Sequence, residues 1–367
     1  METGGTGNKK LSSKEYRDLM AKLSRIRTDA EGYEGKPKAR KYLFILLIVL
    51  FVLALLPLVC IKGLAAGEIT AELKKRTYHA FVKDKYAYLS VEYGLLVYDV
   101  SDPSKPVELG SYMIPGSAVS SFVEGETAYL SGGPEGIFLI DVSDKKNLRL
   151  ISKYDTKGSA MSSVKAGDML FIADGSMGVS VIDVKDKVNP VFGYSIEVED
   201  YTRSVIVDDG MLYVSDGRKG VKSFDTKGTG AAKPVKSLNL GCEARELIES
   251  GGKILAACGS GGVKVFDKAL SENAILTFPT KDFSRGISVK GDLLFSADGN
   301  SGVLIYDLKK DCSKDKTCLV SKVTTTGTAV RVAEHNGFLY ISNDYSGLVI
   351  VDIADPAKPS IVFPKKP

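Results

Sequence analysis

A short motif recurs seven times along the chain and restricts what the chain can fold into. Each copy starts with a Gly, continues as a largely apolar run rich in β-branched residues, and has an Asp five residues after the Gly. The copies start at Gly94, Gly136, Gly178, Gly220, Gly262, Gly302 and Gly347, at spacings of 42, 42, 42, 42, 40 and 45 residues. An apolar run between turn residues is typical of a buried strand. Seven regular copies therefore indicate a repeat architecture.

Each repeat contains four short strand patterns separated by turn residues. In the third repeat the predicted strands cover residues 160–165, 169–173, 179–184 and 191–195. Four strands in about 42 residues form one propeller blade, and radial repetition leaves only short, protected sheet edges. We therefore predict an all-β fold over residues 76–367, a seven-bladed β-propeller with four-stranded blades.

The N-terminal part of the chain predicts one transmembrane helix. Tyr42–Ile61 contains no charged residue, and its 20 residues match the thickness of a bilayer. Basic residues crowd its N-terminal side, so the positive-inside rule places residues 1–41 in the cytoplasm and the propeller outside. We expect an uncleaved signal anchor. A cleaved signal peptide and lipoprotein processing at Cys60 are the alternatives, but the leader is long and Val59 is not a small residue.

Two segments flank this predicted span. Residues 1–41 form a basic tail of net charge +5, with an amphipathic helix pattern that starts at Ser12. A helix of this kind can lie on anionic headgroups or bind a cytoplasmic partner. The alternative is a short, partly disordered tail whose positive charge only sets the topology. Residues 62–75 form a linker with a candidate ring-closing strand. Because the rest of the chain carries a net charge of −1, the composition gives no basis for nucleic-acid binding.

The repeat resembles a known family, the LVIVD-repeat β-propellers. Leu348–Asp352 reads Leu-Val-Ile-Val-Asp, and the turn after the first copy reads Asp-Val-Ser-Asp-Pro from Asp99. The resemblance covers residues 76–363, although the fifth and sixth repeats depart from it, the sixth through a longer loop at 309–317. It implies a propeller in the envelope of a bacterium or archaeon. It implies no particular activity, because function on a propeller depends on its loops and faces.

One column of residues on the innermost strands is a candidate binding site. We count back along each repeat from an aromatic or apolar residue of its second strand. Ten residues back lie Val119, Met161, Arg203, Arg245 and Arg285, and nine residues back lie His79 and Arg331. Arginines at nearly one level of a central channel would attract an anionic ligand or partner. In the alternative interpretation, they pair with nearby acids and hold the blades together. The acids in question are Glu197, Glu199, Asp200, Glu243, Glu246 and Asp282.

The other candidate features are acidic turns and cysteines. The Asp that ends each third strand can accept backbone N–H bonds in the next turn, which is the simpler interpretation than calcium binding. We predict no metal site and no cofactor. Cys312 and Cys318 are expected to form a disulfide in the long loop of the sixth repeat. Cys242 and Cys258 either face each other across a hairpin or are two small buried residues.

The sequence favours a protein that is not an enzyme, and we assign no catalytic residue. It contains no recognisable catalytic order of Ser, His and Asp, no Gly-rich phosphate loop and no haem-attachment motif. We therefore predict a membrane-tethered propeller outside the cytoplasmic membrane that acts as a scaffold for another envelope protein. The alternative is a propeller that binds a small anionic ligand in the Arg-lined channel, as a binding protein or an enzyme.

Overall fold

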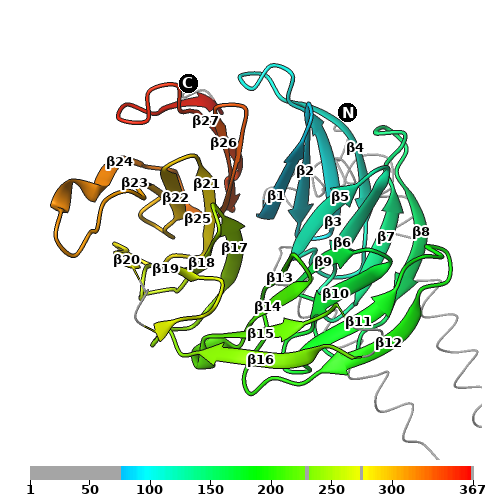
Figure 1. Cartoon of the computed structure of the whole chain (residues 1–367). Helices are drawn as coiled ribbons and strands as arrows, with labels where there is room; N and C mark the ends of the chain where they lie inside the picture. Colours follow the sequence, from blue (N-terminus) through cyan, green and yellow to red (C-terminus); the bar gives the residue numbers. More distant parts are fainter. Residues whose placement is uncertain (1–75, 228–230, 273–275, 365–367) are drawn as a thin grey trace, which may run out of the picture. The chain divides into compact units, whose positions relative to one another are not determined.

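The computed structural model describes residues 76–227, 231–272 and 276–364, and they form seven four-stranded antiparallel sheets in chain order (Figure 1). Blade 1 comprises β1 (Thr77–Lys83), β2 (Tyr86–Val91), β3 (Gly94–Asp99) and β4 (Val107–Met113). Blade 2 comprises β5 (Ser120–Glu124), β6 (Thr127–Ser131), β7 (Ile137–Asp141) and β8 (Arg149–Tyr154). Blade 3 comprises β9 (Ser162–Ala166), β10 (Met169–Ala173), β11 (Val179–Asp183) and β12 (Val191–Ile196).

The other four blades repeat this plan. Blade 4 comprises β13 (Val205–Asp208), β14 (Met211–Ser215), the 3₁₀ turn η1 (Gly217–Lys219), β15 (Val221–Asp225) and β16 (Lys233–Leu238). Blade 5 comprises β17 (Glu246–Ser250), β18 (Lys253–Ala257), β19 (Val263–Asp267) and β20 (Leu276–Phe278). Blade 6 comprises β21 (Gly286–Lys290), β22 (Leu293–Ala297), β23 (Val303–Asp307), the 3₁₀ turn η3 (Lys316–Cys318) and β24 (Leu319–Val323). Blade 7 comprises β25 (Thr328–His335), β26 (Phe338–Asp344), β27 (Gly347–Asp352) and β28 (Ser360–Phe363).

The ring closes without strand exchange between the first and last blades. The first strand of each blade contacts the first strand of the next, and β25 contacts β1. On one side of this junction, Nε2 of His335 lies 2.7 Å from the carbonyl oxygen of Asp84. On the other side, Arg76 forms an ion pair with Asp344, at 3.7 Å. All four strands of blade 7 come from the C-terminal repeat, so the fold prediction of a seven-bladed propeller is confirmed.

The hydrophobic core lies between neighbouring blades. One cluster joins buried residues of blades 6 and 7, among them Ile305 and Ile341, and another joins blades 7 and 1 through Ile350 and Leu89. These side chains come from the apolar runs of the second and third strands. The repeated motif therefore supplies the surface on which the next blade packs, so the repeats stabilise one another.

The Asp after the Gly of each motif has the same structural role in all seven blades. One oxygen of its carboxylate accepts a backbone N–H bond from the following turn, at 2.8–2.9 Å. The seven residues are Asp99, Asp141, Asp183, Asp225, Asp267, Asp307 and Asp352. Such hydrogen bonds are what we expect if the Asp residues stabilise the turns instead of binding calcium. The described part of the chain contains no group of three or more His, Cys, Asp or Glu residues that could hold a metal ion.

The predicted N-terminal segments lie outside the described residues. They are the tail at 1–41, the span at 42–61 and the linker with its candidate strand at 62–75. Residues 76–227, 231–272 and 276–364 include no helix that is long and apolar enough to cross a membrane.

Candidate functional site

The predicted column of inner residues occupies two levels in the structure. Arg245 and Arg285 lie directly before the first strands of their blades, and their backbone N–H groups donate to the last carbonyl of the second strand, each at 2.9 Å. Val119 and Met161 make the same bond in blades 2 and 3, each at 2.8 Å. Arg203 takes the corresponding position in blade 4, where its N–H donates to Oγ of Ser215 at 3.0 Å.

His79 and Arg331 lie one level further along, because their strands contain a bulge. In β25 the pairing with β26 shifts between Ala329 and Arg331, and in β1 it shifts between Thr77 and His79. The bulge adds one residue to the strand. Arg331 pairs with Ser342 in blade 7, and Glu246 pairs with Ala257 in blade 5. Ser342 and Ala257 are equivalent positions, because each lies five residues before the Gly of its motif. Arg331 and His79 therefore lie level with Glu246, one residue away from the level of the other arginines, as their spacing of nine residues instead of ten indicates.

Arg331 of blade 7 contacts residues of blades 5 and 6 and so joins three blades. Its Nη1 lies 2.8 Å from Oε1 of Glu246 in blade 5, and both side chains are about one-sixth exposed, at 16% and 15%. The same Nη1 donates to the carbonyl oxygen of Arg285 in blade 6, at 3.1 Å. The other Glu246 oxygen accepts from the N–H of Ile287 at 2.6 Å. A Cβ at Gly286 would lie only 2.7 Å from Cδ of Arg331, so Gly leaves the space that this side chain crosses.

His79 adds no positive charge to the channel. Burial, with the nearby charge of Arg331 as the second cause, lowers the pKa of His79 to about 3. The ring is therefore neutral at physiological pH. Its Nδ1 is buried and has no hydrogen-bond partner among the described residues.

Arg203 and Arg245 share one carboxylate. Oε1 of Glu243 lies 3.0 Å from Nε of Arg203 and 3.0 Å from Nη1 of Arg245. The arginine side chains are 27% and 22% exposed and the Glu243 side chain is 33% exposed, so this group is open to solvent in part. Burial lowers the pKa of Arg245, and the next largest cause is the charge of Arg203. Positive charge is therefore in excess here.

Two aromatic rings extend this group on either side. The guanidinium of Arg203 lies 4.6 Å from the centroid of the Tyr201 ring. The guanidiniums of Arg245 and Arg285 lie 5.1 Å and 5.3 Å from the centroid of the Phe283 ring. We call the six residues Tyr201, Arg203, Glu243, Arg245, Phe283 and Arg285 the arginine ladder. The two rings were not predicted from the sequence, although each lies two residues before an Arg of the column.

Arg285 has no charged partner in the described structure. Among residues 76–227, 231–272 and 276–364, no carboxylate lies within ion-pair distance of it, and its buried Nε has no hydrogen-bond partner. Of the six acids considered in the sequence, only Glu243 and Glu246 pair with the column. Glu199 and Asp200 pair instead with Lys222 and Arg218.

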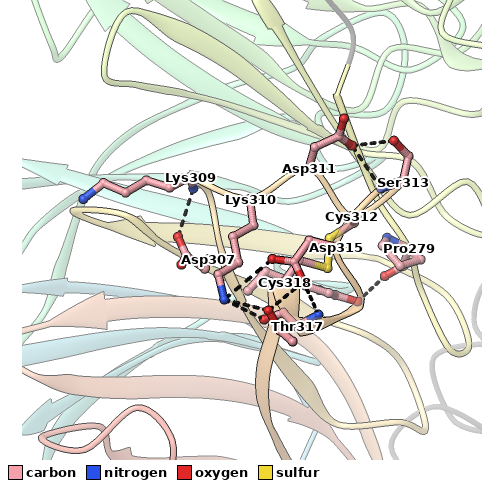
Figure 2. Close-up of a disulfide and its surroundings, with 11 residues drawn as sticks. Pro279, Asp307, Lys309, Lys310, Asp311, Cys312, Ser313, Asp315, Thr317 and Cys318 are labelled. Carbon is pink, nitrogen blue, oxygen red and sulfur yellow. Dashed lines mark hydrogen bonds and ion pairs between the residues drawn. A yellow bond between two sulfur atoms is a disulfide. The ribbon is translucent and has the colours of Figure 1, made fainter.

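The long loop of blade 6 is held by the Cys312–Cys318 disulfide (Figure 2). Figure 2 also shows Lys310 reaching back to this loop, where its Nζ lies 2.8 Å from Oγ1 of Thr317. The carboxylate of Asp315 accepts from the N–H of Thr317 at 2.8 Å. The loop is therefore held together mainly by its own residues.

The second disulfide, Cys242–Cys258, replaces a buried Asp that other blades use to hold a loop. Asp174, Asp216 and Asp298 are fully buried after the second strands of blades 3, 4 and 6. Each accepts hydrogen bonds from the loop that enters its own blade; Asp216, for example, accepts from the N–H of Asp200 at 2.6 Å. Cys258 takes this position in blade 5 and is bonded to the matching loop through Cys242. Of the two open interpretations of this pair, the structure contains the disulfide.

Comparisons with known proteins support the fold. The LVIVD repeat model matches residues 79–114, 115–156, 157–197 and 326–364, which are blades 1, 2, 3 and 7. Blades 4, 5 and 6, which carry the arginine ladder, are not matched. A comparison with curated protein sequences finds no match.

Similar solved structures include three proteins of low sequence identity. The WD40 β-propeller domain of Doa1 has a TM-score of 0.64 and 12% identity, with 77% of this chain and 95% of that chain covered. A computationally designed protein, Ika8, has a TM-score of 0.58 and 10% identity, with coverage of 76% and 83%. BamB from Moraxella catarrhalis has a TM-score of 0.51 and 18% identity, with coverage of 75% and 82%. Together with the matched repeats, this shows that four of the seven blades are LVIVD repeats and that the chain folds as a seven-bladed β-propeller.

Proposed function

We propose that this protein is a membrane-tethered scaffold of the cell envelope, whose propeller binds another envelope protein outside the cytoplasmic membrane of a bacterium or archaeon. The tether is the apolar segment at 42–61. The two cysteine pairs joined within the propeller support an oxidising compartment, where disulfides persist. The fold is shared with BamB and with a WD40 propeller, and function on such a fold depends on its surface.

The observation that carries the binding role is a set of exposed apolar side chains on the outer strands of four successive blades, which we call the outer apolar set. Val107 is on β4, Leu150 on β8, Val191 and Phe192 on β12, and Val235 on β16. Each of these side chains is 43–62% exposed. Outer strands also present unpaired backbone groups, to which a partner can add a strand. Exposed apolar groups on the outer strands of four successive blades favour a protein-binding surface on blades 1–4.

Capture of partners from membranes tests this role. The tagged full-length protein is cross-linked in cells and purified, and the co-purifying proteins are identified by mass spectrometry. We expect an envelope protein that is lost when Phe192 is replaced by Asp, because a charge would then be buried in the interface. Met177→Asp is the matched control, because Met177 is on the same blade, is 49% exposed and lies outside the outer strand. Capture of the same partner by both variants would contradict a role for this surface.

The compartment is tested through the cysteines. We expect that protein isolated from cells under alkylating conditions contains Cys312 bonded to Cys318 and Cys242 bonded to Cys258, because both pairs are already placed for bonding. Peptide mapping without reducing agent measures this. Four alkylated free thiols would argue against an extracytoplasmic propeller.

The alternative function is binding of a small anion in an Arg-lined channel. The geometry reduces the number of residues that could bind the anion. Arg331 is neutralised by Glu246 and His79 is uncharged, so neither is a free anion ligand. What supports anion binding is the unpaired guanidinium of Arg285, together with Arg203 and Arg245.

A further inference from the structure

The arginine ladder has more positive charge than its own carboxylate can neutralise. It holds three guanidiniums, of Arg203, Arg245 and Arg285, and one carboxylate, of Glu243. Three positive charges and one negative charge leave a net charge of +2. Glu246 does not reduce this excess, because its ion pair is with Arg331.

The guanidinium of Arg285 lies near an aromatic ring that provides no oxygen or nitrogen acceptor. Its central carbon is 5.3 Å from the centroid of the Phe283 ring. This contact therefore leaves the N–H donors of Arg285 without an oxygen or nitrogen partner. The Nε of Arg285 is buried and without a partner among the described residues. A buried donor of this kind is rare in a folded protein, and it favours a group that is supplied from outside.

The rings of the ladder are held in place before any ligand binds. A Cβ at Gly259 would lie 2.6 Å from Cζ of Phe283, and a Cβ at Gly175 would lie 3.0 Å from the same atom of Tyr201. Each ring therefore fills the space over a glycine of the neighbouring blade. The backbone next to each ring is fixed by a β-bridge to that glycine, from Ser284 and from Thr202. A site that is already ordered loses little entropy when it binds.

We infer that the arginine ladder binds the carboxylates of an acidic peptide segment from a partner protein. Guanidinium forks match carboxylates in geometry and charge. The ladder runs across blades 4, 5 and 6, so an extended segment with several carboxylates can reach more than one guanidinium, unlike a small dicarboxylate. This site is separate from the outer apolar set, and it lies on the three blades that the LVIVD model leaves unmatched.

Fluorescence anisotropy with the full-length protein in lipid nanodiscs tests this inference. The probe is a labelled octapeptide of alternating Glu and Ser, and the control peptide has Gln in place of Glu. We expect binding of the Glu peptide only. Arg285→Gln should raise its Kd by about tenfold, because charge-assisted hydrogen bonds are lost. The melting temperature should change by less than about 2 °C, because no ion pair is broken.

Arg218→Gln is the matched control. Arg218 is on blade 4, is 84% exposed and pairs with Asp200. Because this substitution is also Arg→Gln, it changes the net charge by the same amount. We expect it to change the Kd by less than about twofold, since exposed pairs contribute little. Equal weakening by both variants, or no binding of the Glu peptide, would overturn the inference. Glutarate that binds as tightly as the peptide would overturn the assignment to a peptide. Partner capture that depends on Phe192 would survive any of these outcomes.

Discussion

Replacement of Arg331 by Met is expected to lower the free energy of unfolding by about 3–5 kcal/mol, because it leaves the carboxylate of Glu246 buried without its cation. The same change at Arg285 should cost less than about 1 kcal/mol, since that guanidinium has ring contacts but no ion pair among the described residues. Denaturant unfolding of the two purified variants measures the difference. It separates an arginine that holds blades together from one that is free for a ligand.

The pH dependence of the Arg331→Met variant identifies the responsible group. Burial raises the pKa of Glu246 above its usual value of 4.5, although Arg331 opposes this shift. Without Arg331 the folded-state pKa rises further, so the folded protein binds a proton that the unfolded chain has already released. Stability relative to the wild type should therefore increase as the pH falls through the folded pKa toward 4.5, and be lowest at neutral pH and above.

A double variant provides the control. Glu246→Gln with Arg331→Met removes both charges and keeps an amide oxygen that can accept from the N–H of Ile287. Its stability should return to within about 1–2 kcal/mol of the wild type, because no charge is left buried without a partner. A single Arg331→Met variant as stable as the wild type would show that this ion pair does not hold the blades. It would also return Arg331 to the set of candidate ligand residues.

The propeller could be predicted from the sequence because its signal is repeated. A Gly, an apolar run and an Asp mark each third strand, and the Asp caps the following turn in every blade. The level of each Arg was harder to predict. The spacing of nine residues at His79 and Arg331 was visible in the sequence, but a bulge depends on how two strands pair. Only the structure shows that this extra residue moves Arg331 toward Glu246.

The partners of the arginines could not be predicted, because they depend on contacts between blades. Glu199 and Glu243 are both near the column in sequence, yet only Glu243 reaches it. The Cys242–Cys258 bond could not be predicted for a similar reason. A comparison of the residues that follow the second strand would have indicated it, since Cys258 takes the place of Asp174, Asp216 and Asp298. Such a comparison needs the role of the buried Asp to be known first.

Replacement of Asp298 by Ala should lower the free energy of unfolding by about 3–5 kcal/mol, because several donors of one loop lose their acceptor together. The carboxylate of Asp298 is fully buried and accepts from Oγ1 of Thr280 and from the N–H groups of Lys281, at 2.8 Å, and Asp282, at 3.2 Å. These residues lead into Phe283 and Arg285. Denaturant unfolding measures the loss, and binding of the Glu peptide should weaken in the same variant because the ladder loses its support.

Asp298→Asn separates the two consequences. Its amide oxygen can still accept from the N–H groups of Lys281 and Asp282, and its NH₂ can donate to the hydroxyl of Thr280, so we expect a loss of only about 1–2 kcal/mol. Blade 7 already has an amide at this position, Asn343, which donates to the carbonyl oxygen of Thr326 at 2.8 Å. If the Ala and Asn variants were equally stable, the buried carboxylate would not be what holds the loop. The position of Phe283 and Arg285 would then depend on the bridge between Gly259 and Ser284.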